Sequence, residues 1–183
     1  MASQGPNSAG TGANDASVGS RAWNNPSNIV SSNNTRAFAA NANTQYLKAT
    51  NFGFSIPGGA TIGGIVVEIE RYCTDSASNN AKDLEVKIVK GGSIQSTNRA
   101  DLASNWPLSD AYATYGSSTD LWGTTWTDSD INSSSFGVVI RADIVNFGKG
   151  TVLAEVDHVR ITVYYTTGGG GGSSTNPILY IGN

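Results

Sequence analysis

The feature that most constrains the fold is the stretch Glu155 to Tyr165, EVDHVRITVYY, the longest uninterrupted β-type pattern in the chain. From Val159 onward, apolar side chains alternate with polar or aromatic ones, which is the period of a half-buried strand. The apolar residues fall at even positions before Asp157 and at odd positions after His158. Because one extra residue reverses the facing of a strand, we predict a central strand with a β-bulge at Asp157-His158.

The composition favours short strands over long helices. Ser, Thr, Asn and Gly are abundant, whereas Leu, Met, Glu and Lys are scarce. Charged residues make up 14% of the chain and the formal net charge is −3, so a nucleic-acid surface is not expected. No run approaches the ~18 apolar residues of a membrane-spanning helix. The N-terminal sequence lacks the regions of a signal peptide, which predicts a product of the cytoplasm or a trimmed mature form.

Further alternating segments predict the other strands. Residues 35–40 and 45–50 are expected to form a hairpin. Ile65, Val67 and Ile69 define the dry face of the next strand, and Leu84, Val86 and Ile88 that of the one after it. These two strands are expected to be paired or near neighbours, with Glu68 or Glu70 opposite Lys87.

A last strand is predicted at 136–144, with Phe136, Val138, Ile140, Ala142 and Ile144 on its inner face. Before it, Asp128 or Ser129 is expected to cap a short helical turn. Seven or eight strands with regular turns and no helical period predict an all-β fold, an antiparallel β-sandwich resembling a jelly roll.

The domain organisation follows from composition. Residues 1–18 are predicted to be a flexible N-terminal arm, because they have too little apolar content to offset the entropy of ordering. The sandwich is expected at 19–167. Residues 168–175, GGGGGSST, are predicted to be a flexible linker with a reach of roughly 15 Å. Residues 176–183 are then an apolar tail, and its Pro177, Ile178, Leu179, Tyr180 and Ile181 are predicted to add a strand to a sheet edge.

The sequence predicts no catalytic site, no cofactor site and no metal site. His158 is the only histidine, and no strained nucleophile turn of the GxSxG type accompanies it, so a structural role is favoured over a catalytic one. Cys73 is the only cysteine and lacks the companions of a zinc site. The glutamates Glu68, Glu70 and Glu85 are predicted on solvent faces, which favours ion pairs over paired glycosidase carboxylates.

Two further clusters have competing interpretations. Asp128, Asp130 and Asn132 have the opening spacing of a calcium loop, but the glycine and the final glutamate are absent, so helix capping is favoured. Trp106, Trp122 and Trp126, with two tyrosines between them, are either a glycan-stacking platform or a plug for an open end of the sandwich. The plug is favoured, because tryptophan is seldom left exposed without a partner.

Three stretches resemble a β-sandwich domain that recurs in bacteriophage virion proteins of the tail-fibre and capsid-decorating type, and in some bacterial surface proteins. They are YLKATNFGFSIPGGATIGGIVVEIER, WPLSDAYATYGSSTDLWGTTWTDSDINSSSFGVVI and VDHVRITVYY, within residues 22–166. The resemblance implies a structural role in a virion and assigns no catalytic residue.

The function expected from these observations is that of a non-enzymatic virion protein that forms homo-oligomers and contacts other virion proteins. Neither a nucleic acid nor a membrane is an expected partner, and no cofactor is expected. The alternatives are a secreted filament or surface-layer subunit that uses strand addition, and a carbohydrate-binding module that uses the tryptophans.

Overall fold

The alternating stretch near the C-terminus forms β10 (Leu153–Thr166), which lies inside one sheet of the computed structural model, as predicted. The structure describes residues 1–74, 80–146 and 151–167. On one side, β10 pairs with β5 (Thr61–Cys73), whose far side pairs with β8 (Ala111–Ser117). On its other side, β10 pairs first with β3 (Ala37–Ala40) and then with β1 (Ala2–Ser8). We call this five-stranded layer sheet A.

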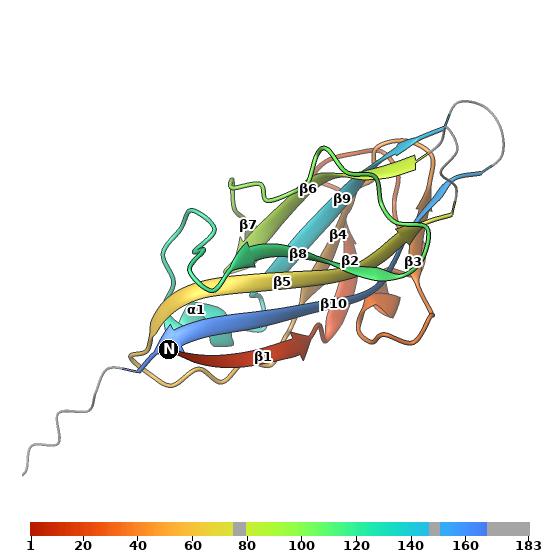
Figure 1. Ribbon diagram of the computed structural model, residues 1–183. Coiled ribbons are helices and arrows are strands. Elements are labelled where there is room, and N and C mark those ends of the chain that lie inside the picture. The colour runs from red at the N-terminus through yellow and green to blue at the C-terminus, as the bar shows by residue number, and fades with distance from the viewer. Residues whose placement is uncertain (75–79, 147–150, 168–183) are drawn as a thin grey trace, which may run out of the picture.

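The second layer, sheet B, also has five strands. Their order is β2 (Thr11–Asp15), β4 (Tyr46–Thr50), β9 (Gly137–Val145), β6 (Asn80–Lys90) and β7 (Ser93–Ile94). Every strand pairing in both sheets is antiparallel. Figure 1 shows β10, β5 and β8 in one layer and β4, β9 and β6 in the layer behind it. The prediction of an all-β antiparallel sandwich is therefore confirmed.

The space between the sheets is filled by the side chains that the alternation assigned to it. Ile65, Val67 and Ile69 of β5 have no exposed surface, as predicted. The predicted inner face of β9 is also buried, and it consists of Phe136, Val138, Ile140, Ala142 and Ile144. These residues belong to one continuous apolar cluster, whose burial supplies the main driving force for folding.

The N-terminal segment differs from the prediction of a flexible arm. Residues 2–8 and 11–15 form β1 and β2, so the chain extends sheet A and then sheet B before it reaches residue 19. The ordering depends on backbone pairing, because residues 1–18 contribute only one small buried apolar side chain, that of Ala9. Gly12 permits the close packing, since a Cβ atom there would lie 2.1 Å from the Pro26 carbonyl oxygen.

The hairpin predicted for residues 35–50 is wrong, although both strands exist. β3 pairs with β10 in sheet A, and β4 pairs with β2 and β9 in sheet B. The intervening turn carries two residues with positive φ, Asn41 at 47° and Ala42 at 84°. This turn leads the chain from one sheet to the other. Thr44, which is fully buried, fixes the crossing because its Oγ1 accepts a hydrogen bond from the Ala142 N–H at 2.8 Å.

The predicted pairing of the second pair of strands is also wrong. β5 belongs to sheet A and β6 to sheet B, so Glu68 and Glu70 do not lie opposite Lys87. Instead, Glu68 lies opposite Arg160 of β10 and binds it at 2.9 Å, while Lys87 binds Glu85 of its own strand at 2.6 Å. Each of these two ion pairs thus forms within a single sheet.

Two β-bulges reverse the facing of long strands. The predicted bulge in β10 is confirmed, since the register with β5 shifts between Val156 and His158. A second bulge, which the apolar pattern of β6 does not reveal, shifts the register of β6 with β9 between Asp83 and Glu85. As a result Leu84, expected to face inward, is only half-buried, and Asp83 is buried in its place.

Candidate functional site

The bulge in β6 places a carboxylate between the two sheets. Asp83 is 2% exposed and accepts hydrogen bonds from the Trp106 indole N–H at 2.7 Å and the Tyr115 hydroxyl at 2.8 Å. Arg71 of β5, itself buried, lies 3.4 Å from the same carboxylate and 4.8 Å from the centre of the Trp106 ring. Burial raises the pKa of the Tyr115 hydroxyl, so this group remains a donor. The cluster links β5 and β8 of sheet A to β6 of sheet B.

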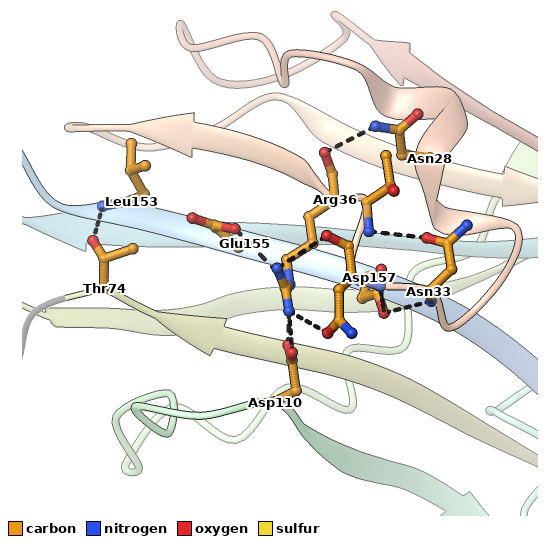
Figure 2. A network of polar contacts seen from close by, with 10 residues as sticks. Asn28, Asn33, Arg36, Thr74, Asp110, Leu153, Glu155 and Asp157 are labelled. Atoms are coloured by element: carbon orange, nitrogen blue, oxygen red, sulfur yellow. Dashed lines mark hydrogen bonds and ion pairs between the residues drawn. The ribbon is translucent and has the colours of Figure 1, made fainter.

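The bulge in β10 buries a second carboxylate, at the gap between β3 and β1. Asp157 is 1% exposed, and its Oδ2 accepts hydrogen bonds from the backbone N–H groups of Asn33 and Asn34, both at 3.0 Å (Figure 2). Its Oδ1 is buried and has no hydrogen-bond partner among the described residues. The carboxylate therefore holds the loop that precedes β3 against the bulge.

Arg36 binds this loop to the neighbouring strands. Its guanidinium forms an ion pair with Asp110, lies 4.0 Å from Glu155 of β10, and packs 4.9 Å from the centre of the Tyr72 ring. It also donates to the side-chain oxygen of Asn34 at 2.6 Å. Figure 2 shows Arg36 between Asp110 and Glu155, with Asp157 and Asn33 beside it. The hydrogen bond to Asp110 raises the pKa of Arg36, which therefore remains a cation.

His158, the candidate catalytic residue, is 7% exposed and links three strands. Its Nδ1 lies 2.8 Å from the Tyr112 hydroxyl of β8, and its Nε2 lies 2.9 Å from Ser8 Oγ of β1. Burial lowers the pKa of His158, so the neutral ring is favoured. The serine–histidine contact lacks the orienting carboxylate of a triad, because Asp157 is engaged with the loop backbone. The arrangement accounts for a structural histidine.

The three tryptophans do not form an exposed platform. Trp106, Trp122 and Trp126 are 3%, 0% and 9% exposed. The indole N–H of Trp122 donates to the Ile65 carbonyl at 3.0 Å, and that of Trp126 donates to the Leu121 carbonyl at 3.0 Å. This geometry agrees with the interpretation of a packed plug and leaves no indole face of the three for stacking against a sugar.

The residues with calcium-loop spacing lie around a short helix, α1 (Asp128–Asn132). The cap is Thr127, one residue before the predicted position, and it exchanges hydrogen bonds with Asp130 in a capping box. The Asn132 amide bonds the backbone of Ile56, and Asp128 accepts from the Gly59 N–H. Within the part of the chain that the structure describes, no group of three acidic, histidine or cysteine side chains is placed to hold a metal ion.

The glutamates do not converge. Glu68 and Glu70 lie on the outer face of sheet A, whereas Glu85 lies on sheet B with Lys87, Arg141 and Tyr46 as partners. Burial raises the pKa of Glu85, but the hydrogen bonds from these partners outweigh burial, so its pKa lies below the ordinary value. Glu85 is therefore a stable anion in an ion-pair cluster. Cys73 is buried at the end of β5.

The predicted linker and tail, with Pro177, Ile178, Leu179, Tyr180 and Ile181, lie outside the described residues. β10 ends at Thr166, opposite Thr61 at the beginning of β5. No helix in the described segments is long and apolar enough to cross a membrane. Comparison with protein families, curated proteins and solved structures gives no match for this chain.

Proposed function

We propose that this chain is a non-enzymatic structural subunit of a phage-type virion, in which it decorates a capsid or forms part of a fibre. It assembles with copies of itself and with other virion proteins through its β-sandwich and its C-terminal segment. The observation that carries this proposal is the use of the buried polar groups: each joins elements that are far apart in the sequence.

Three clusters support a structural role rather than a reactive one. Asp83 connects the two sheets, Asp157 fixes a loop on a bulge, and His158 connects β1, β10 and β8. A hydrogen-bonded buried polar group stabilises one arrangement of strands, because its bonds would be lost in any other. A subunit that must keep its shape within a particle benefits from this specificity.

The resemblance to virion β-sandwich domains supports a place in a virus particle. The sequence of the tail supports assembly by strand addition. Residues 177–181 combine β-forming side chains with the absence of charge, as in segments that add to an open sheet edge. The sequence before them, residues 168–175, has the Gly/Ser-rich composition of linkers that join a domain to a binding segment.

The direct test is the location of the chain. Purified particles from an infected culture are expected to contain it in a fixed ratio to the major capsid or fibre protein, by quantitative mass spectrometry. Recovery of the chain in cell-free filaments, as a precursor cleaved after a signal peptide, would contradict the proposal and favour a secreted filament subunit.

A second test isolates the tail. Deletion of residues 176–183 is expected to abolish concentration-dependent association in light scattering while the unfolding midpoint of the sandwich stays the same. The matched control is Gly170→Ser, which alters the linker and keeps the tail. Unchanged association after the deletion would remove the tail from the proposed assembly.

A further inference from the structure

The outer edge of β8 is the least protected sheet edge of the sandwich. Within the described residues, β8 pairs with β5 alone, and its one further backbone bond runs from the Asp120 N–H to the Ser117 carbonyl. Its seven residues, AYATYGS, include no charge and no proline. Charges, prolines, bulges and covering segments are the means by which natural sheets block edge-to-edge pairing.

The edges at the other side of the sandwich are blocked. β1 carries Pro6 and a register break between Gln4 and Asn7. The amide of Gln4 also bonds Ser55, and that of Asn7 bonds the Phe52 carbonyl.

Covering segments or short length protect the remaining edges. On β3, Phe38 exchanges two backbone hydrogen bonds with Asn24. On β2, Gly12 packs against the 3-10 turn η1 (Pro26–Ile29). β7 has two residues.

The pairing pattern identifies which groups of β8 face outward. In an antiparallel sheet, the N–H and C=O groups of successive residues point to opposite sides. The Val159 carbonyl points toward β1, because it accepts a hydrogen bond from the Ala9 N–H there. The next residue, Arg160, therefore directs its N–H and C=O toward β5, where it lies opposite Glu68. The backbone N–H and C=O of Glu68 therefore point away from β8. Thr114 lies opposite Glu68, so its own N–H and C=O point to the open side of β8.

By the same alternation, Tyr112 and Gly116 also direct backbone groups outward. The side chain of Thr114 is exposed. Of the three large apolar side chains exposed in the described residues, Leu108 (58%) lies three residues before β8, whereas Leu102 (60%) belongs to the segment whose backbone bonds β6. An incoming strand finds free hydrogen-bonding groups along this edge, and one exposed apolar side chain, Leu108, precedes the end at which β8 begins.

We infer that the outer edge of β8 accepts residues 177–181 of a second copy as an added strand. This inference rests on the proposed function and names the acceptor of the tail. Five extended residues span about 17 Å, which fits within the roughly 23 Å of a seven-residue strand. Both partners are uncharged, so pairing does not desolvate a charge.

A second copy is the better donor than the same chain. A strand added beyond β8 lies three strand spacings, about 14 Å, from β10, which is within the roughly 15 Å expected for the linker, so the choice of donor depends on the loop after β8. The loop after β8 crosses this path, because the Asp120 carbonyl accepts from the Ile65 N–H at 3.0 Å and Trp122 donates to the Ile65 carbonyl. The tail of a neighbour approaches the edge directly from solvent.

The experiment compares Thr114→Pro with Thr114→Val in the full chain. Proline removes the outward N–H without removing a bond to β5, whereas valine keeps that N–H. Wild type and Thr114→Val are expected to associate in light scattering, and Thr114→Pro is expected to remain monomeric. In hydrogen exchange, the Thr114 amide is expected to be protected about tenfold or more in the associated wild type relative to a chain that ends at Thr167.

Three other variants keep the test decisive if Thr114→Pro does not fold. Thr114→Lys places a charge on the edge, and Ile178→Asp or Tyr180→Asp alters the tail alone; all three are expected to abolish association. Association that persists in these variants, with an unprotected Thr114 amide, overturns the inference but leaves the proposed subunit role intact. Protection of Thr114 in a dilute wild-type monomer assigns the edge to the same chain and also overturns the inference. A wild type that never associates contradicts the proposed function itself.

Discussion

Two bulges in this sandwich bury an aspartate each, and they do so in different ways. In β6, Asp83 faces the space between the sheets and is bound by Arg71, Tyr115 and Trp106. In β10, Asp157 is covered by a surface loop, and backbone N–H groups satisfy one of its two oxygens. The β6 bulge thus holds a charge pair inside the core, whereas the β10 bulge holds a loop on the outside of it.

The difference predicts how each site responds to mutation. Removal of one partner from a buried charge pair leaves the other charge uncompensated in a low-dielectric interior. Removal of a carboxylate that caps backbone N–H groups exposes neutral donors, which water reaches when the loop loosens. We therefore expect a graded series of effects, from the interior cluster to the half-buried side chains around the loop.

The largest effect is expected for Asp83→Ala. The Arg71 guanidinium would lose its counter-ion, and the Trp106 and Tyr115 donors would lose their acceptor. We expect a decrease of about 3–5 kcal/mol in the free energy of unfolding, measured by urea denaturation. The matched control is Asp143→Ala on the half-buried outer face of β9, with an expected change within about 0.5 kcal/mol. A loss of less than about 1 kcal/mol for Asp83→Ala would erase the distinction between the two bulges.

The second effect is expected for Asp157→Ala. The backbone N–H groups of Asn33 and Asn34 would lose their acceptor, which we expect to cost about 1–3 kcal/mol of unfolding free energy. Asp157→Asn retains one carbonyl oxygen and is expected to cost less. In hydrogen exchange, the Asn33 and Asn34 amides should lose protection in the alanine variant while the β5 amides do not. Equal losses in both variants would show that the charge of Asp157, rather than its acceptor oxygen, holds the loop.

The same comparison shows how far the sequence allowed the fold to be predicted. In β10, the apolar residues change from even to odd positions, so the bulge at Asp157-His158 was visible. In β6, Leu84 continues the phase of Val86 and Ile88, so the pattern concealed the bulge and the inward position of Asp83. The strands β1 and β2 were missed for a related reason: they are held by backbone pairing, which leaves no apolar period.

The partners of each polar residue were less predictable than the strands. The sequence order suggested that β3 pairs with β4 and β5 with β6, but the chain crosses between the sheets in both cases. Contacts such as Arg36 with Asp110 or His158 with Ser8 depend on this topology, because their members are far apart in the sequence. Periodicity gives the facing of a residue and carries no information about which strand lies beside it.

The third prediction uses His158 of the β10 bulge, because the chain has no other histidine and the β6 bulge therefore lacks one. Because the pKa of His158 is lowered from 6.5 in the fold, the unfolded chain binds a proton more readily, and protonation favours unfolding. The contribution of His158 is therefore complete above about pH 6.5 and is lost as pH falls from there toward its folded pKa.

The loss of unfolding free energy that His158 causes is expected to stay below about 1.4 kcal/mol per pH unit, which is the limit for the uptake of one proton. The neighbouring charges are Glu70, Glu68, Arg160 and Asp157. Urea midpoints between about pH 5 and 7 should show a shallower decline in His158→Gln than in the wild type. Identical profiles would show that the carboxylates, rather than His158, set the acid sensitivity of this region.

The smallest effect is expected for Arg36→Lys. The guanidinium donates to both oxygens of Asp110 and to Asn34, whereas an ammonium group is a point charge that cannot reproduce this fork. Because the side chains of Arg36 and Asp110 are 18% and 22% exposed, we expect solvent screening to limit the loss to about 0.5–1 kcal/mol in urea unfolding. The exposed Arg21→Lys is the control and should be silent. A loss as large as that of Asp83→Ala would mean that the loop cluster and the interior charge pair contribute equally to stability, and the contrast between the two bulges would then have to be attributed to position alone.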